Sequence, residues 1–249
     1  MRPLLLLLLI GLLSACAEDD KAPAAMLVTD MQKNLQLQFM NAEPGDIINI
    51  PAGFFEMTRS LSLKVDGVTV RGAGMDKTIL SFKHQVSGAE GMLVTANDFL
   101  IEDLAIEDAK GDALKINEGK NIIIRRVRTE WTNGPATENG AYGIYPVQTE
   151  NVLIEGVVAI GASDAGIYVG QSRQVIVRNS RAEFNVAGIE IENTLDADVY
   201  NNVAINNTGG VLVFNMPNLS QEGRRTRIFN NRIEDNNTPN FALPGGAVA

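Results

Sequence analysis

The stretch of sequence that decides the fold is residues 153–202, which read LIEGVVAIGASDAGIYVGQSRQVIVRNSRAEFNVAGIEIENTLDADVYNN. Two runs in it, Gly166–Val169 and Gly188–Ile191, open with Gly-Ile and alternate aliphatic with other side chains. Short alternating runs broken by Gly, Asn and Asp are typical of β-strands separated by turns. The stretch therefore predicts short strands that recur at a fixed spacing.

The recurrence extends through most of the chain. One series of strand-like runs is marked by the residues Val70, Ile101, Ile124, Ile154, Val177, Tyr200 and Phe229. Their spacings are 31, 23, 30, 23, 23 and 29 residues, which indicates a basic period of 23 with three insertions of six to eight residues.

Two further series run in phase with the first. The second comprises residues 113–116, 143–146, 166–169, 188–191 and 210–213, and the third comprises residues 104–106, 157–160, 181–184 and 203–205. Each repeat therefore holds three short strands rich in β-branched residues, with no helical period.

Three strands per repeat predict a chain that winds into a coil and stacks on itself. The predicted fold class is all-β: a right-handed, single-stranded parallel β-helix of about seven coils. A leucine-rich repeat needs a leucine spacing that is missing here, and a β-propeller needs a period of about forty residues. At about 4.8 Å per rung, the column is expected to be about 34 Å long.

The two ends of the predicted domain, residues 30–249, differ. We expect Asp30 to cap a short helix that ends at Met40, with Leu35 and Phe39 on the face that covers the first coil. Residues 236–249 read as a loop with no element to close the last coil. We therefore expect the C-terminal end to be uncapped or the array of coils to be incomplete.

Asparagines recur at one step of successive coils, directly after the first strand. They are Asn179, Asn202 and Asn231. Asn tolerates the left-handed backbone conformation and can hydrogen-bond its counterpart in the next coil. The pattern predicts a partial ladder of asparagines with a structural role.

Residues 1–16 predict a signal peptide. Arg2 precedes the apolar run Leu4–Leu13, which is too short to span a bilayer as a helix. The run leads into Leu13-Ser14-Ala15-Cys16, which resembles the lipobox of bacterial lipoproteins. This resemblance implies cleavage before Cys16 and acylation of that residue; a plain secretory signal with a chance Cys is the alternative.

The residues after Cys16 bear on localisation. Residues 17–29 read as a tether. Ala17 is not the Asp that marks inner-membrane retention in many such lipoproteins. We expect a lipid-anchored protein of the bacterial cell envelope, held in the outer membrane and facing the periplasm or the cell surface.

Composition excludes several classes of partner and site. The formal net charge is −9, from 30 acidic and 21 basic residues, and no basic stripe is visible, so we expect no nucleic-acid partner. A single Cys excludes an intrachain disulfide, and a single His excludes a metal site built from several histidines.

Three segments carry a resemblance to a known group of proteins: Gly72–Thr78, Asn139–Gln148 and Ala162–Gln171. With the repeats, residues 35–240 resemble the right-handed β-helix repeat proteins of bacterial envelopes. That superfamily includes pectate lyases, polygalacturonases, alginate epimerases and periplasmic proteins of copper-site assembly. A closer resemblance is to parallel β-helix lipoproteins whose own activity is not established. The resemblance implies a fold and an envelope location but no reaction.

The predicted coil places side chains in files along the second series. The outward file contains Lys115, Tyr145, Tyr168, Glu190 and Leu212, and a file three residues further on contains Glu118, Gln148, Gln171, Asn193 and Asn215. Tyr faces flanked by amides suit stacking on sugar rings and hydrogen bonding to hydroxyls. We predict a polysaccharide-binding face at Tyr145, Tyr168, Gln148 and Gln171. Cross-rung packing without a ligand is the alternative.

Two insertions border this predicted sheet, Trp131–Asn139 before its second strand and Pro217–Arg225 after its fifth. They are expected to wall a groove on it.

Candidates for catalysis are fewer. Asp164, Glu190 and Lys115 are the residues an enzyme would use, and Asp112 and Glu192 lie near them in the repeat. Carboxylates at these positions could also bind Ca²⁺ through their oxygens, and no other cofactor is expected. The alternative is that these carboxylates are solvated side chains of acidic turns without a ligand. Arg173 and Arg178 suit pairing with a uronate carboxylate, or are simple turn charges.

The catalytic signatures of the resembled enzymes are missing. The chain has no Asp-Pro-His-Asp run, no Asp cluster with a His and Arg-x-Lys, and no visible pairing of an Arg base with Ca²⁺-binding Asp residues. The only histidine, His84, lies in an early loop. Three functions therefore remain: polysaccharide binding, an interaction scaffold for an envelope protein, and a divergent polyuronate lyase or epimerase.

Overall fold

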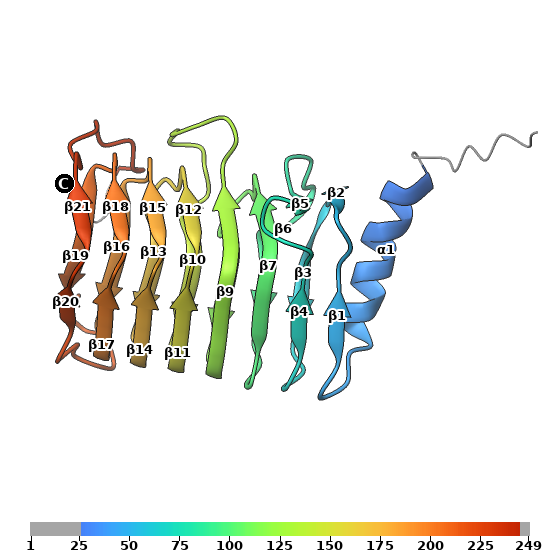
Figure 1. Ribbon diagram of the computed structural model, residues 1–249, viewed down its shortest axis with the longest axis horizontal. Helices are drawn as coiled ribbons and strands as arrows, with labels where there is room; N and C mark the ends of the chain where they lie inside the picture. The colour runs from blue at the N-terminus through green and yellow to red at the C-terminus, as the bar shows by residue number, and fades with distance from the viewer. Residues whose placement is uncertain (1–25, 245–249) are drawn as a thin grey trace, which may run out of the picture.

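The computed structural model describes residues 26–244, with side chains from residue 31 onward. Parallel strands stack into an elongated column, and helix α1 (Met26–Met40) lies across one end of it (Figure 1). Leu35 and Phe39 of α1 are buried against the first coil, as predicted. The helix begins at Met26, however, so Asp30 lies inside it and is not its N-cap.

One sheet takes one strand from each coil and has seven strands. They are β3 (Arg59–Leu63), β6 (Ser87–Val94), β8 (Leu114–Asn117), β10 (Tyr142–Val147), β13 (Ala165–Gly170), β16 (Ala187–Glu192) and β19 (Gly209–Phe214). All neighbouring pairs in this seven-stranded sheet are parallel, which confirms the predicted parallel β-helix of about seven coils.

A second sheet of fourteen strands forms the other sides of the column. Its first strands in each coil are β1 (Ile47–Asn49), β4 (Thr69–Arg71), β7 (Leu100–Glu107), β9 (Lys120–Glu130), β11 (Glu150–Glu155), β14 (Arg173–Arg178), β17 (Leu195–Tyr200) and β20 (Arg227–Phe229). The remaining strands are β2 (Gly53–Glu56), β5 (Thr78–Ser81), β12 (Val158–Ile160), β15 (Arg181–Glu183), β18 (Val203–Ile205) and β21 (Arg232–Glu234).

The register of the first series agrees with the sequence as far as Val177 and differs by one residue after it. Val177 pairs with Val199, and Val199 with Ile228, instead of the predicted Tyr200 and Phe229. Val199 is fully buried in the continuous aliphatic core, whereas Tyr200 stacks outside it on Phe229 with ring centroids 4.9 Å apart. The coil that leads to Val199 is therefore one residue shorter than predicted.

The asparagine ladder exists, with a corrected first step. Asn202 accepts a hydrogen bond from the Ser180 backbone N–H, and its Nδ2 donates to Oδ1 of Asn231 at 3.0 Å. Ser180, not Asn179, occupies the equivalent step, and Asn179 is the preceding left-handed residue with φ +52°.

A second ladder, absent from the sequence prediction, joins Asn185, Asn207 and Asn236 at the next turn.

Some predictions concern the N-terminal segment outside the described residues. These are the signal peptide of residues 1–16, the acylated Cys16 and most of the tether, whose last residues, 26–29, belong to α1. Within residues 26–244, no helix is both long and apolar enough to cross a membrane.

Candidate functional site

The outer face of the seven-stranded sheet carries the predicted file of side chains, here called the outer column. Lys115 pairs in register with Tyr145, and Tyr168 with Glu190, which pairs with Leu212. Ile144 and Ile167, one residue earlier, are aligned in the core. The alternation of inward and outward residues along the strands thus places the outer column as the period of the sequence predicts.

Three tyrosines gather on this face and form the tyrosine cluster: Tyr142, Tyr145 and Tyr168. Their ring centroids lie 4.5 to 4.9 Å apart, and the Tyr145 and Tyr168 rings meet edge to face. Tyr168 is only 5% exposed, because the other two rings pack against it and its own ring lies over Gly170. The expected sugar-stacking surface is therefore reduced to Tyr145 and Tyr142, which are half-buried.

Carboxylates surround the tyrosine cluster. The Tyr168 hydroxyl donates to Glu192 at 2.5 Å, and the Tyr142 hydroxyl donates to Asp164 at 3.1 Å. Burial raises the pKa of both phenols, and the neighbouring carboxylates raise it further. These hydroxyls therefore stay protonated at neutral pH and act only as hydrogen-bond donors to the carboxylates.

Glu190 is the most perturbed carboxyl group of the site. It is 1% exposed, and its Oε1 has no hydrogen-bond partner. Desolvation, reinforced by the charges of Asp164 and Glu192, raises its pKa to about 8. Burial also raises the pKa of Asp164, with Glu192 adding to the effect against the hydrogen bond from Tyr142. At neutral pH the Glu190 carboxyl is thus largely protonated.

Lys115 places a cation in the outer column, on β8 next to Tyr145 of β10. The Lys115 ammonium lies 4.7 Å from the centre of the Tyr145 ring and 3.5 Å from Oδ2 of Asp112. Burial raises the pKa of Asp112, and Lys115 opposes that rise. Lys115, Tyr145, Tyr168, Asp164 and Glu190 therefore lie close to one another on or beside the outer column.

The two predicted glutamines lie at the edge of this face. Gln148 and Gln171 follow β10 and β13 in the left-handed conformation, with φ +55° and +48°. They line a hollow of about 460 Å³, here called the glutamine hollow, with Lys120, Arg173 and Ser220. Among the described residues, the Arg173 guanidinium has no ion-pair partner, whereas Lys120 pairs with Glu150 at 3.3 Å.

The second insertion overhangs the glutamine hollow. Gln221 donates to the backbone oxygens of Ser172 and Asn193 at 2.9 and 2.7 Å, and Ser220 donates to Gln171 at 3.4 Å. These bonds hold the insertion over the coil edge, so it walls a hollow there. The first insertion instead sends Trp131 into the core, where its indole N–H donates to the Ala109 oxygen at 2.8 Å.

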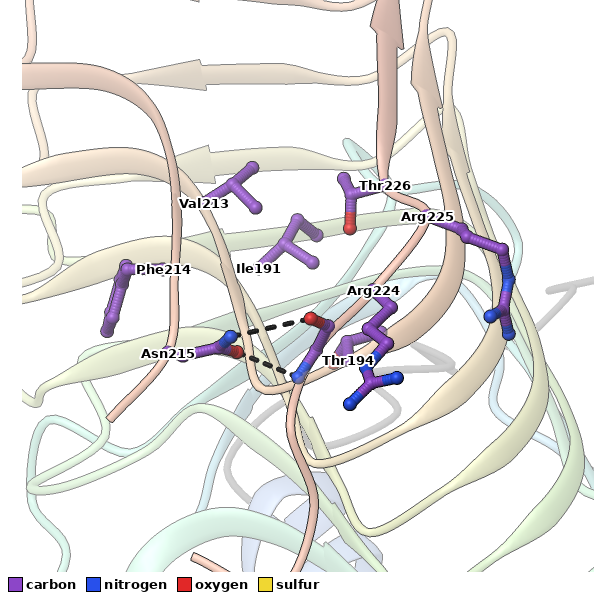
Figure 2. Close-up of a pocket in the computed structure, with 9 residues that line it drawn as sticks. Ile191, Thr194, Val213, Phe214, Asn215, Arg224, Arg225 and Thr226 are labelled. Atoms are coloured by element: carbon purple, nitrogen blue, oxygen red, sulfur yellow. Dashed lines mark hydrogen bonds between the residues drawn. The ribbon is translucent and has the colours of Figure 1, made fainter. Parts of the chain in front are cut away.

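A separate pocket of about 400 Å³ lies beneath the second insertion (Figure 2). The buried Ile191 and the partly exposed Val213 line it, and Asn215 bridges to Gly223 across its mouth. Arg224 and Arg225 line it, but they already pair with Glu222 and Asp196. This pocket contains none of the predicted site residues.

Tyr142 belongs to the tyrosine cluster but was not predicted as a site residue, and His84 lies away from the cluster. Tyr142 was not singled out, although the quoted segment Asn139–Gln148 contains it. His84 is exposed and has Glu56, at 3.9 Å, as its nearest acidic partner. Within residues 26–244, no three acidic, His or Cys side chains are grouped so as to hold a metal ion.

Comparison with known proteins supports the fold. Residues 57–221 match the family model described as the right handed beta helix region. No curated relative matches the sequence.

Three solved structures are similar to the chain. The A-module of the mannuronan C-5 epimerase AlgE6 from Azotobacter vinelandii has a TM-score of 0.66 at 22% identity; the match covers 82% of this chain and 60% of that one. An alginate lyase from Paenibacillus sp. str. FPU-7 has a TM-score of 0.51 at 14% identity, covering 81% of this chain and 92% of the lyase. The Dettilon tailspike protein has a TM-score of 0.51 at 14% identity, covering 81% and 46%. At these identities the likeness shows the fold alone.

Proposed function

Because the chain belongs to the right-handed β-helix family, we propose that it binds a polysaccharide along the outer face of its seven-stranded sheet. The names of two similar structures, a mannuronan epimerase and an alginate lyase, support a carbohydrate-related role for this fold. We propose further that Cys16 is acylated and anchors the protein in the outer membrane, on the strength of the Leu-Ser-Ala-Cys sequence.

One observation carries the proposal of binding: an aromatic surface and a polar hollow lie on consecutive parts of the same strands. Tyr145 is in β10, and Gln148 comes three residues later at the edge of the glutamine hollow. A half-buried Tyr ring suits the apolar face of a sugar, and amides suit its hydroxyls. Lys115 and Arg173 add cations at both parts, which favours an acidic polysaccharide.

Replacing Tyr145 by Ala is expected to weaken binding of an acidic polysaccharide by about tenfold, because the cluster loses one of its two half-buried rings. Affinity electrophoresis through gels that contain single polysaccharides measures the effect. The matched control is Tyr200→Ala, which removes the one tyrosine on another face of the column. Equal retardation of both variants, or no retardation of the wild-type chain by any glycan, contradicts the proposal. In that case the remaining hypothesis is a scaffold that binds an envelope protein.

A second pair of variants probes the glutamine hollow without disturbing the turns. Gln171→Asn keeps a residue that tolerates positive φ, as Asn193 does in the next coil, but shortens the side chain. We expect binding to weaken about threefold. Gln174→Asn is the control, because Gln174 has φ +55° and lines a hollow on a different sheet. If both substitutions weaken binding equally, the glutamine hollow is not part of the site.

A divergent polyuronate lyase or epimerase is the second candidate function, and the grouping of Lys115, Tyr145 and Glu190 favours it. Both reactions remove the proton beside a uronate carboxylate, so they need a cation at that carboxylate and positioned acid and base groups. Lys115 supplies a cation, and burial raises the pKa of Tyr145 so that its phenol keeps its proton. An absorbance assay for unsaturated uronates tests the lyase. No signal on any polyuronate, with or without Ca²⁺, rules it out, and proton exchange at C5 tests the epimerase.

A further inference from the structure

A different face of the column carries an unbroken row of aliphatic side chains on the outside. Leu100, Ile123, Leu153 and Ile176 align in register on β7, β9, β11 and β14, and we call them the aliphatic stripe. The register continues into Thr69 before the stripe and Asp198 after it. The stripe is therefore confined to four coils, about 14 Å of the column.

A hollow of about 310 Å³ lies on the stripe, lined by Ile123, Leu153 and Ile176 with the amides of Asn121, Asn151 and Gln174 beside them. The four side chains are partly exposed. Single aliphatic residues are common on protein surfaces, whereas a contiguous apolar row is a feature of surfaces that bind a partner. All the described residues that line this hollow belong to β9, β11 and β14.

Beside the stripe, two residues further along each strand, runs a column of alternating charges. Its register is Arg71, Glu102, Arg125, Glu155 and Arg178. Arg125 and Arg178 both pair with Glu155, at 3.3 and 2.7 Å, and their side chains are 32% and 35% exposed.

The stripe and the charge column are both arranged about one two-fold axis, which lies midway between β9 and β11. A rotation of 180° about an axis parallel to the strands reverses the order of the coils and keeps the position along each strand. It sets Ile123 opposite Leu153 and Leu100 opposite Ile176. It also sets Arg125 opposite Glu155, and Glu102 opposite Arg178.

The start of the same strands obeys the same symmetry. Lys120 comes to lie opposite Glu150, and Asn121 opposite Asn151, so that charges meet opposite charges and amides meet amides. A two-fold interface needs a surface that is complementary to itself in this way.

We propose that this face binds a second copy of the chain, with the two aliphatic stripes stacked antiparallel about that axis. The outer column lies outside this interface, because it belongs to the other sheet, whereas Lys120 and Glu150 at the edge of the interface also line the glutamine hollow.

Charge reversal tests the proposed pairing directly. Arg125→Glu and Glu155→Arg each place like charges opposite one another across the axis, so each variant alone is expected to dimerise more than about thirtyfold less tightly than the wild-type chain. A mixture of the two variants restores opposite charges at both contacts and is expected to form a heterodimer. Energy transfer between differently labelled copies measures all three cases, and circular dichroism checks that each variant folds.

Arg181→Glu is the matched control, since it breaks the pair of Arg181 with Glu183 on β15, away from the stripe, and should leave dimerisation unchanged. Leu153→Asp, in the stripe itself, is expected to give a monomer. A wild-type chain that stays monomeric at about 100 μM overturns the proposal, as that limit is weaker than specific dimers show. Equal dimerisation of the charge variants and the mixture also overturns it.

Discussion

Asn207→Ala is expected to lower the free energy of unfolding by about 3–5 kcal/mol, since several buried polar groups lose their partners together. Asn207 is fully buried. Its Oδ1 accepts from the backbone N–H and the amide of Asn185, and its Nδ2 donates to the backbone oxygen of Ala182 and to Asn236. Alanine leaves the first of these N–H groups without an acceptor inside the column.

Urea denaturation of the variant beside Asn206→Gly measures the effect. Asn206 is the preceding residue, has φ +56° and lies partly exposed, so glycine keeps the turn and removes only a surface amide. The control is expected to change stability by no more than about 1 kcal/mol. Similar losses for both variants indicate that the ladder contributes little and that the turn conformation dominates.

Glu190→Gln is expected to stabilise the protein at pH 8 by about 4 kcal/mol and to have little effect at pH 4. The pKa of Glu190 rises from its ordinary 4.5 to about 8 on folding, chiefly through desolvation. Below pH 4.5 both the folded and the unfolded chain hold the proton, so the group costs nothing. Between pH 4.5 and 8 only the unfolded chain releases it, and stability falls as the pH rises. Glutamine carries no charge and abolishes that loss.

The measurement is the difference in free energy of unfolding between variant and wild type at several pH values. Glu222→Gln is the control, because Glu222 lies in the second insertion with 74% of its side chain exposed. A difference for Glu190→Gln that does not grow between pH 5 and pH 8 contradicts the burial of a neutral carboxyl group. Glu222→Gln is expected to show no pH-dependent difference.

The period of the sequence was sufficient to predict the coils, because each strand buries every second residue and each coil repeats the last. The error at Val199 arose from the adjacent Asn201 and Asn202, either of which fits the asparagine step. Only the burial of Val177 and Val199 distinguishes the two registers. The helix start at Met26 was missed because Asp30 is a strong capping residue that lies within the helix.

The candidate site was predictable as a file of residues but not as a surface. The period placed Lys115, Tyr145, Tyr168 and Glu190 in one column, and the register agrees. Burial of Tyr168 depends on Tyr142, which packs across it from the start of the neighbouring strand, 4.7 Å away. Such contacts follow from side-chain volume and rotamer, which a repeat pattern does not encode.

Hydrogen exchange tests the central claim most directly, since it reports where on the column a polysaccharide binds. The exchange is measured with and without an acidic polysaccharide that retards the protein in affinity electrophoresis. We predict slower exchange in β10, β13 and the insertion at residues 217–223, with β12 and β15 of the other sheet unchanged at equal protein concentration. Slower exchange confined to other strands, or none in β10 and β13 under saturating polysaccharide, would contradict a binding face on the seven-stranded sheet.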